Sequence, residues 1–103
     1  MKKPLVSIGL PTFNRAHCIR RCLDSLTTQT YPHIELIISD DGSTDETQAI
    51  CEAYAKKDSR IRYIRQPHNK GLIGNFYFTL SQAAGEYFGS AVDDDWFHPT
   101  YVE

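Results

Sequence analysis

The chain of 103 residues has no apolar run close to the roughly 20 residues that a membrane-spanning helix needs. It has three cysteines, an odd number without CxxC spacing, which argues against a disulfide framework and fits a reducing compartment. Its net charge of −2 gives no basic surface for nucleic acid. The GxGxxG and GxxxxGK[ST] phosphate cradles are also absent. Ordinary globular composition remains, and we expect one domain over residues 1–103.

Alternating apolar segments of two kinds fill the chain. Short apolar runs predict strands at residues 5–10, 34–39, 61–65 and 86–92. Apolar residues at helical spacing predict helices at residues 16–29, 43–57 and 72–83. Leu72, Phe76, Leu80 and Ala83 mark the third of these helices. This β-α-β-α-β-α-β order predicts an α/β fold, with an open, mostly parallel four-stranded sheet and helices on both faces.

Local signals predict where the second helix begins and where the third helix ends. Ser43 followed by Glu46 matches a capping box, so the second helix is expected to begin there. Gly85 is expected to close the third helix in a left-handed cap. Cys18 and Cys22 lie one helical turn apart, which fits either a metal pair or two reduced thiols packed on one helix face.

A polar loop follows each predicted strand, and ligands of such sheets bind at the carboxyl ends of the strands. The loops are TFNR, DDGS, HNKG and DDD, in chain order. We expect the spatial strand order 3-2-1-4, with Asp41 and Asp94 converging on one edge. Asp40 is open to two interpretations, a helix-entry residue or a ligand contact. Asp41 is placed to accept a hydrogen bond from a base imide or a ribose hydroxyl.

Three successive carboxylates, Asp93, Asp94 and Asp95, repel one another. A solvated turn explains them without function, because Asp is a common turn former. A divalent cation is the alternative explanation, since Mn²⁺ and Mg²⁺ bind carboxylate and phosphate oxygens. Trp96 and Phe97 fit packing beneath this loop or a sugar platform, and His98 fits a turn residue or a ligand contact.

The segments VSIGLPTFNR, ELIISDDGSTDET and GEYFGSAVDDDWFHP resemble the N-terminal half of the family 2 glycosyltransferases. The resemblance implies the Rossmann-like half of a GT-A fold. It also implies transfer of a sugar, with inversion, from a nucleotide diphosphate sugar (a UDP-sugar first) to a glycan or glycoconjugate acceptor. Mn²⁺ or Mg²⁺ would assist, and the longer enzyme would act in the cytoplasm or at the cytoplasmic side of a membrane.

Carried onto this sequence, the resemblance implies roles for particular residues. The turn Pro11, Thr12 and Phe13 would flank the base, and Asp41 would contact its edge. Asn14, Arg15 and Asn75 occupy polar family positions without an assigned contact, and turn or cap hydrogen bonding explains them equally well.

The acidic loop departs from the family pattern. Val92 stands where many members have the first Asp of LDSDD. The ribose carboxylate would then be Asp93, while Asp94 would bind the metal and Asp95 would share it. The acceptor site and general base would follow Glu103, so we expect the 103-residue chain alone to transfer no sugar. The alternatives are a non-catalytic nucleotide-binding or interaction module and, less compatible with PTFNR after the first strand, a receiver-type domain.

Overall fold

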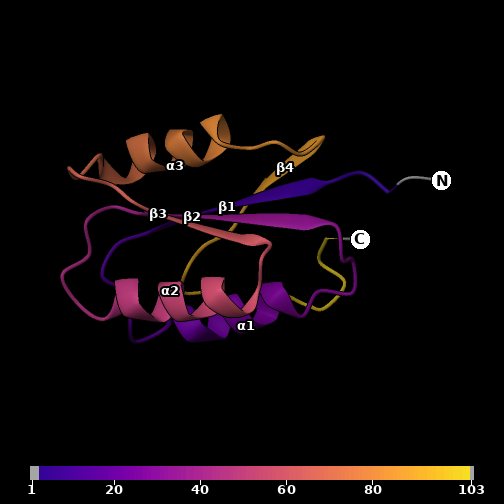
Figure 1. The fold of residues 1–103 in the computed structure, drawn as a ribbon, viewed down its shortest axis with the longest axis horizontal. Helices are drawn as coiled ribbons and strands as arrows, with labels where there is room; N and C mark the ends of the chain where they lie inside the picture. The colour runs from indigo at the N-terminus through magenta and orange to yellow at the C-terminus, as the bar shows by residue number, and fades with distance from the viewer. Residues whose placement is uncertain (1–2, 103) are drawn as a thin grey trace.

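The computed structural model describes residues 3–102, which form four strands and three helices in strict alternation (Figure 1). The elements are β1 (Val6–Thr12), α1 (Ile19–Thr27), β2 (Ile34–Asp40), α2 (Thr47–Lys57), β3 (Ile61–Arg65), α3 (Gly71–Ser81) and β4 (Tyr87–Ser90). All four predicted strands are therefore present. β1 runs two residues further than predicted, and β4 ends two residues earlier.

The sheet is parallel throughout, in the order β3-β2-β1-β4. Val6 pairs in register with Ile34 of β2 and Tyr87 of β4, and Leu36 pairs with Ile61 of β3. α3 lies on one face of the sheet, and α1 and α2 lie on the other (Figure 1). The expected fold class and spatial order are confirmed, and all four strands end at the same edge.

The main hydrophobic cluster lies on one side of the sheet. Alternate residues of the two central strands, Ile8 and Leu10 with Leu36 and Ile38, form one buried cluster with α1 and α2. The helices contribute Ile19, Cys22, Leu23, Leu26, Ile50 and Cys51 to it. The two helices below the sheet therefore supply the apolar burial that stabilises the fold.

The opposite face of the sheet holds the buried Ile37 beside small and polar residues such as Gly9 and Ser39, and the fully buried residues of α3 that meet it are polar. Asn75 and Thr79 are the buried residues of α3. Gly9 permits the close approach, because a Cβ there would stand 2.4 Å from Thr79 Oγ1. Two of the four predicted apolar residues of this helix face outward, since Leu72 is 80% exposed and Leu80 is 43% exposed, whereas Phe76 packs against Phe88. Helical spacing was correct, but polar contacts decide which side of α3 meets the sheet.

The capping-box prediction is wrong, because α2 begins at Thr47 rather than at Ser43. The Ser43 hydroxyl donates to Asp40 Oδ1 over 2.6 Å, so it does not cap the helix. Glu46 makes no side-chain cap either. Instead, Asp45 Oδ1 accepts the Thr47 N–H over 2.9 Å.

Gly85 does not provide a left-handed helix cap. α3 ends at Ser81, and the glycines with positive φ among residues 3–102 are Gly42 and Gly71. Gly85 is needed for a close crossing, because a Cβ there would lie 2.6 Å from the Leu5 carbonyl oxygen. Position 85 therefore does require glycine, but because two backbone segments approach closely there and not because a helix ends in a left-handed cap.

The first helix also starts later than predicted, at Ile19. The residues before it form a turn, in which the Arg15 carbonyl oxygen accepts the N–H groups of Cys18 and Ile19. This turn places Arg15 ahead of the helix and beside the carboxyl edge of the sheet.

The three cysteines are free thiols, and we expect only one to react in the folded protein. Cys22 and Cys51 are fully buried, and burial raises the pKa of each to about 12. Cys18 is half-buried, and burial raises its pKa less. Treatment with N-ethylmaleimide at pH 8 should modify Cys18 alone, as read by mass spectrometry, and all three thiols in urea. Rapid modification of two thiols without urea would contradict this packing.

Candidate functional site

An open cavity of about 1060 Å³ lies at the carboxyl edge of the sheet. The loops after all four strands reach it, as Phe13, Asp41, Asn69 and Asp93 show. Of the predicted site residues, all but Asp95 line it: Pro11, Thr12, Phe13, Asn14, Arg15, Asp41, Asn75, Asp93 and Asp94. The expected convergence of Asp41 and Asp94 is therefore confirmed, whereas the role of each residue stays a prediction.

A smaller cavity of about 450 Å³ adjoins the first at the same edge. Phe13, Asp41 and Asn69 line both cavities, and Phe13 is 45% exposed. Arg65 and Gln66 line the smaller one and were not predicted. Their signal was present in the sequence, because they follow the third strand into the loop that contains HNKG.

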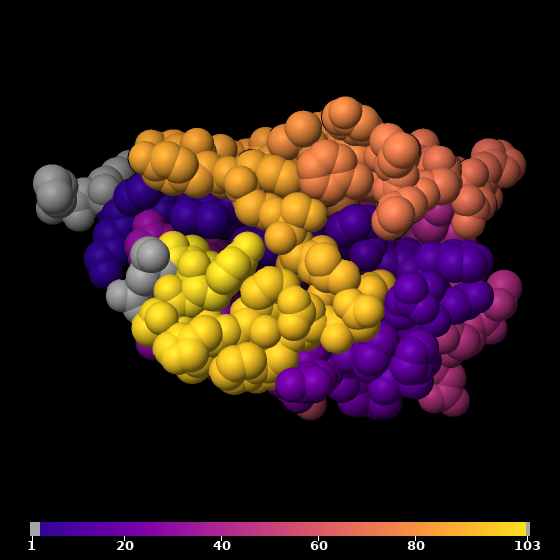
Figure 2. All heavy atoms as spheres, turned by 180° about the vertical axis from the view of Figure 1, so that it is seen from behind, coloured from indigo at the N-terminus to yellow at the C-terminus, as the bar shows by residue number. Residues whose placement is uncertain are grey.

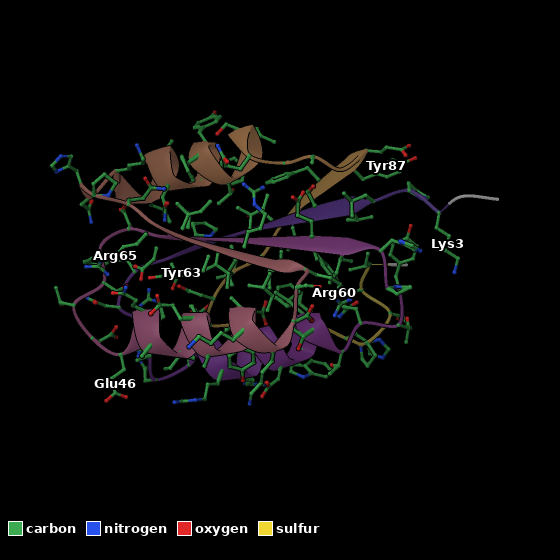
Figure 3. All side chains as sticks on the ribbon, in the orientation of Figure 1. Lys3, Glu46, Arg60, Tyr63, Arg65 and Tyr87 are labelled. Carbon is green, nitrogen blue, oxygen red and sulfur yellow. The ribbon has the colours of Figure 1, made fainter. Side chains whose placement is uncertain are left out.

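Asp40 is a structural residue, fully buried at the end of β2. Its Oδ1 accepts the N–H and the hydroxyl of Ser43, and its Oδ2 accepts the Tyr63 hydroxyl over 2.6 Å. Arg65 Nη1 lies 3.8 Å from the same Oδ2, and Figure 3 shows Tyr63 and Arg65 near one end of β3. Burial and the Asp40 carboxylate raise the pKa of Tyr63, so the hydroxyl stays a donor. Asp40 is therefore a structural residue as the first interpretation had it, but it holds the loop after β2 rather than the entry of α2, which begins at Thr47.

Asp41 ties the end of β2 to the start of α3. Its Oδ1 accepts the Lys70 N–H over 2.6 Å, and its Oδ2 accepts the Gly71 N–H over 3.0 Å. A carboxylate placed there interacts favourably with the helix dipole. Each oxygen keeps further acceptor capacity, and the side chain lines both cavities. Contact with a base edge therefore remains chemically open to Asp41.

Cross-linking hydrogen bonds fix the loop after β1 to the loop after β2. Asn14 has a left-handed backbone with φ 52°. Its N–H donates to Ser43 Oγ over 2.8 Å, and its Oδ1 accepts the Thr44 N–H over 2.8 Å. Asn75 is likewise committed, because its Nδ2 donates to the Ser39 carbonyl oxygen over 2.9 Å. Asn14 therefore makes the turn hydrogen bonds of the alternative interpretation, whereas Asn75 bonds the backbone of β2 from within α3 and caps no helix.

The three carboxylates of the acidic loop have different surroundings. Asp93 is 8% exposed; its Oδ2 accepts the Thr12 hydroxyl over 2.8 Å, and its Oδ1 accepts Arg15 Nε over 3.3 Å. Burial raises the pKa of Asp93, against the lowering effects of Thr12 and Arg15. Asp94 is exposed on the cavity and has no hydrogen-bond partner within residues 3–102. Asp95 Oδ1 accepts the Trp96 N–H over 2.8 Å.

Residues after the acidic loop anchor it to α1. Phe97 is buried, and its N–H donates to Ser25 Oγ over 3.1 Å. Gln29 Nε2 donates to the His98 carbonyl oxygen over 2.8 Å. Figure 2 shows this carboxyl segment, in yellow, against the purple surface of the first helix, with α3 in orange above. Phe97 therefore packs beneath the loop as predicted, whereas Trp96 is 46% exposed.

The acidic loop fits a divalent cation that binds together with substrate phosphates. No three His, Cys, Asp or Glu side chains gather as a metal cage within the described part of the chain. Mg²⁺ and Mn²⁺ bound with substrate phosphates need only one or two protein carboxylates. Asp94, which lines the cavity and has no hydrogen-bond partner within residues 3–102, is a carboxylate of the type such a site requires. Asp93 is already engaged by Thr12 and Arg15, and Asp95 does not line the cavity.

Comparison with known proteins agrees with this geometry. The family model "Glycosyl transferase family 2" matches residues 7–103. Glycosyltransferase GlyA of Streptococcus pneumoniae is 39% identical over 98 residues, which is 95% of this chain and 14% of GlyA. The crystal structure of S. aureus TarS 1–349 in complex with UDP gives a TM-score of 0.86 at 31% identity, covering 93% of this chain and 29% of that TarS 1–349 chain.

A mannosyltransferase is also similar, namely PcManGT from Pyrobaculum calidifontis in complex with GDP-Man and Mn²⁺. Its TM-score is 0.84 at 25% identity, over 93% of this chain and 29% of that one. The chain thus spans less than a third of the proteins it matches. No helix within residues 3–102 has the length and apolarity to cross a membrane. The family match and the four-stranded parallel fold together place this chain in glycosyl transferase family 2, as a region with the GT-A fold.

Proposed function

We propose that the chain is the donor-binding region of an enzyme that transfers a sugar from a nucleotide diphosphate sugar to a glycan or glycoconjugate. The observation that carries this proposal is the convergence of Asp41, Asp93 and Asp94 on one cavity, from the ends of β2 and β4. Ligands of open α/β sheets bind at this edge. The names of the similar structures, which hold UDP or GDP-Man, support the same class of donor.

UDP is the first nucleotide to test, because the similar structure with the higher TM-score contains it. In this proposal the base lies against Phe13 and Asp41 in the smaller cavity, and the ribose contacts Asp93. Asp94 would hold Mn²⁺ or Mg²⁺, which would supply positive charge beside the donor's diphosphate. The remaining sequence of the longer enzyme would supply the acceptor site and a general base.

Calorimetric titration of UDP and GDP, each with Mn²⁺ and with EDTA, tests this proposal. Metal and diphosphate each supply ligands for the other, so Mn²⁺ should tighten UDP binding by about 5- to 150-fold, the usual range of coupling between two ligands. The longer enzyme serves as a second sample if its additional walls are needed for measurable affinity. Equal UDP affinity with Mn²⁺ and with EDTA would mean that the acidic loop is a solvated turn without a metal-binding role. Tighter binding of GDP than of UDP would overturn the choice of base.

A further inference from the structure

Arg15 is the only lysine or arginine among the described residues that line the larger cavity. Three acids, Asp41, Asp93 and Asp94, line the same cavity. A nucleoside diphosphate would add several negative charges to this acidic surface. One divalent cation near Asp94 offsets part of this repulsion, and the position of Arg15 offers a second positive charge.

The backbone of Arg15 is firmly held. Its N–H donates to Thr47 Oγ1 over 2.9 Å, which ties it to the first residue of α2. Its carbonyl oxygen accepts the N–H groups of Cys18 and Ile19, so the residue also begins the turn into α1. The position of the Cα atom is therefore set before any ligand binds, which reduces the entropic cost of using this side chain.

The side chain of Arg15 is fixed at one nitrogen and free at the others. Nε donates to Asp93 Oδ1 over 3.3 Å, while the side chain as a whole is 46% exposed. Within residues 3–102, neither Nη1 nor Nη2 has a hydrogen-bond acceptor. A guanidinium offers its N–H groups as a planar fork that matches phosphate oxygens. This cavity residue therefore has unused donors of the type that binds a diphosphate.

We propose that Arg15 binds the diphosphate of the donor through its Nη groups while Nε stays on Asp93. This assignment rests on the proposed function and names the protein group that holds the phosphates beside the metal. Arg15 would connect the loop after β1 to the acidic loop through one side chain. It would also stabilise the charge that develops on the diphosphate as the sugar leaves, because a fixed cation there needs no reorganisation.

Affinities for uridine and UDP in four proteins test the assignment. The samples are the parent chain, Arg15→Gln, Arg15→Lys and a matched control, Arg20→Gln, all with Mn²⁺. Arg20 is exposed on α1 and lines neither cavity, so its variant makes the same charge change elsewhere. Because a half-exposed ion pair contributes little to stability, Arg15→Gln should fold, which a thermal melt verifies.

Arg15→Gln should weaken UDP binding by about 10- to 100-fold, the effect of losing hydrogen bonds between charged groups. Uridine affinity should change by about twofold or less, since uridine has no phosphate. The UDP affinity of Arg15→Lys should lie between those of the parent chain and Arg15→Gln, because lysine keeps the positive charge and lacks the planar fork of N–H donors.

The outcomes separate this assignment from the proposed function. A parent chain that binds UDP and an Arg15→Gln variant that binds it equally would overturn the assignment alone. Equal losses for uridine and UDP would overturn it as well and make Arg15 a residue that only positions the loop. If neither the parent chain nor the longer enzyme binds UDP, the proposed function fails and the assignment fails with it.

Discussion

Replacing Asp94 with alanine is expected to remove the gain in UDP affinity that Mn²⁺ provides. Asp94 is the carboxylate of the acidic loop that faces the larger cavity without a hydrogen-bond partner in residues 3–102. Removing a metal ligand should therefore cost the whole coupling, about 5- to 150-fold in affinity with Mn²⁺ present. Affinity in EDTA should stay the same or rise slightly, because one like charge has been removed.

Two neighbouring variants provide the controls for Asp94. Asp95→Ala should reduce the effect of Mn²⁺ less, since Asp95 does not line the cavity and bonds the Trp96 N–H. Asp93→Ala should weaken UDP binding with and without Mn²⁺, because its predicted contact is the ribose. The folding stability of Asp94→Ala should stay within about 0.5 kcal/mol of the parent, as for other exposed positions. A Mn²⁺ effect that survives in Asp94→Ala would exclude this residue as the metal ligand.

Asp40→Ala should destabilise the fold more than any change in the acidic loop. Its carboxylate is fully buried and accepts hydrogen bonds from the Ser43 N–H, the Ser43 hydroxyl and the Tyr63 hydroxyl. Alanine would leave these donors without their acceptor, and the free energy of unfolding should fall by about 3 to 5 kcal/mol. Urea unfolding followed by circular dichroism measures this loss.

Tyr63→Phe and Glu46→Ala calibrate the Asp40 measurement. Tyr63→Phe removes one hydrogen bond to the carboxylate and should lower the free energy of unfolding by about 1.5 kcal/mol. This milder variant tests the role of Asp40 if Asp40→Ala does not fold. Glu46 is exposed in the same region, where Figure 3 labels it, and makes no cap. Its replacement should therefore change stability by less than about 0.5 kcal/mol. A folded Asp40→Ala protein that loses less than about 1 kcal/mol would refute the structural role of Asp40.

The strands and their common edge were predictable because both follow from short-range patterns. Apolar runs identify strands, and parallel pairing then brings the loops after the strands together. Asp41 and Asp94 could therefore be placed on one cavity from sequence alone. Their proposed roles came from the family motifs, because hydrophobic periodicity predicts secondary structure and carries no information about ligands.

The errors arose where tertiary contacts override a local signal. Ser43 has the pattern of a cap, but the buried Asp40 carboxylate takes its hydroxyl. Leu72 and Leu80 have the spacing of a buried stripe, but Asn75 pairs with Ser39 and sets the orientation of α3. Periodicity identifies a helix and its faces, whereas the partner surface decides which face is buried.

The residues that stabilise the fold are largely different from the residues of α3 that shape the larger cavity. The core cluster lies mainly between the sheet and the α1–α2 layer, and Ala91 is its one described member that also lines the larger cavity. The cavity wall formed by α3 includes Leu72, Ile73 and Tyr77, which are exposed and outside the core cluster. Substitutions at these three positions can change the shape of the wall at little cost to folding. The shape of this cavity wall can therefore change while the sheet and its core cluster stay the same.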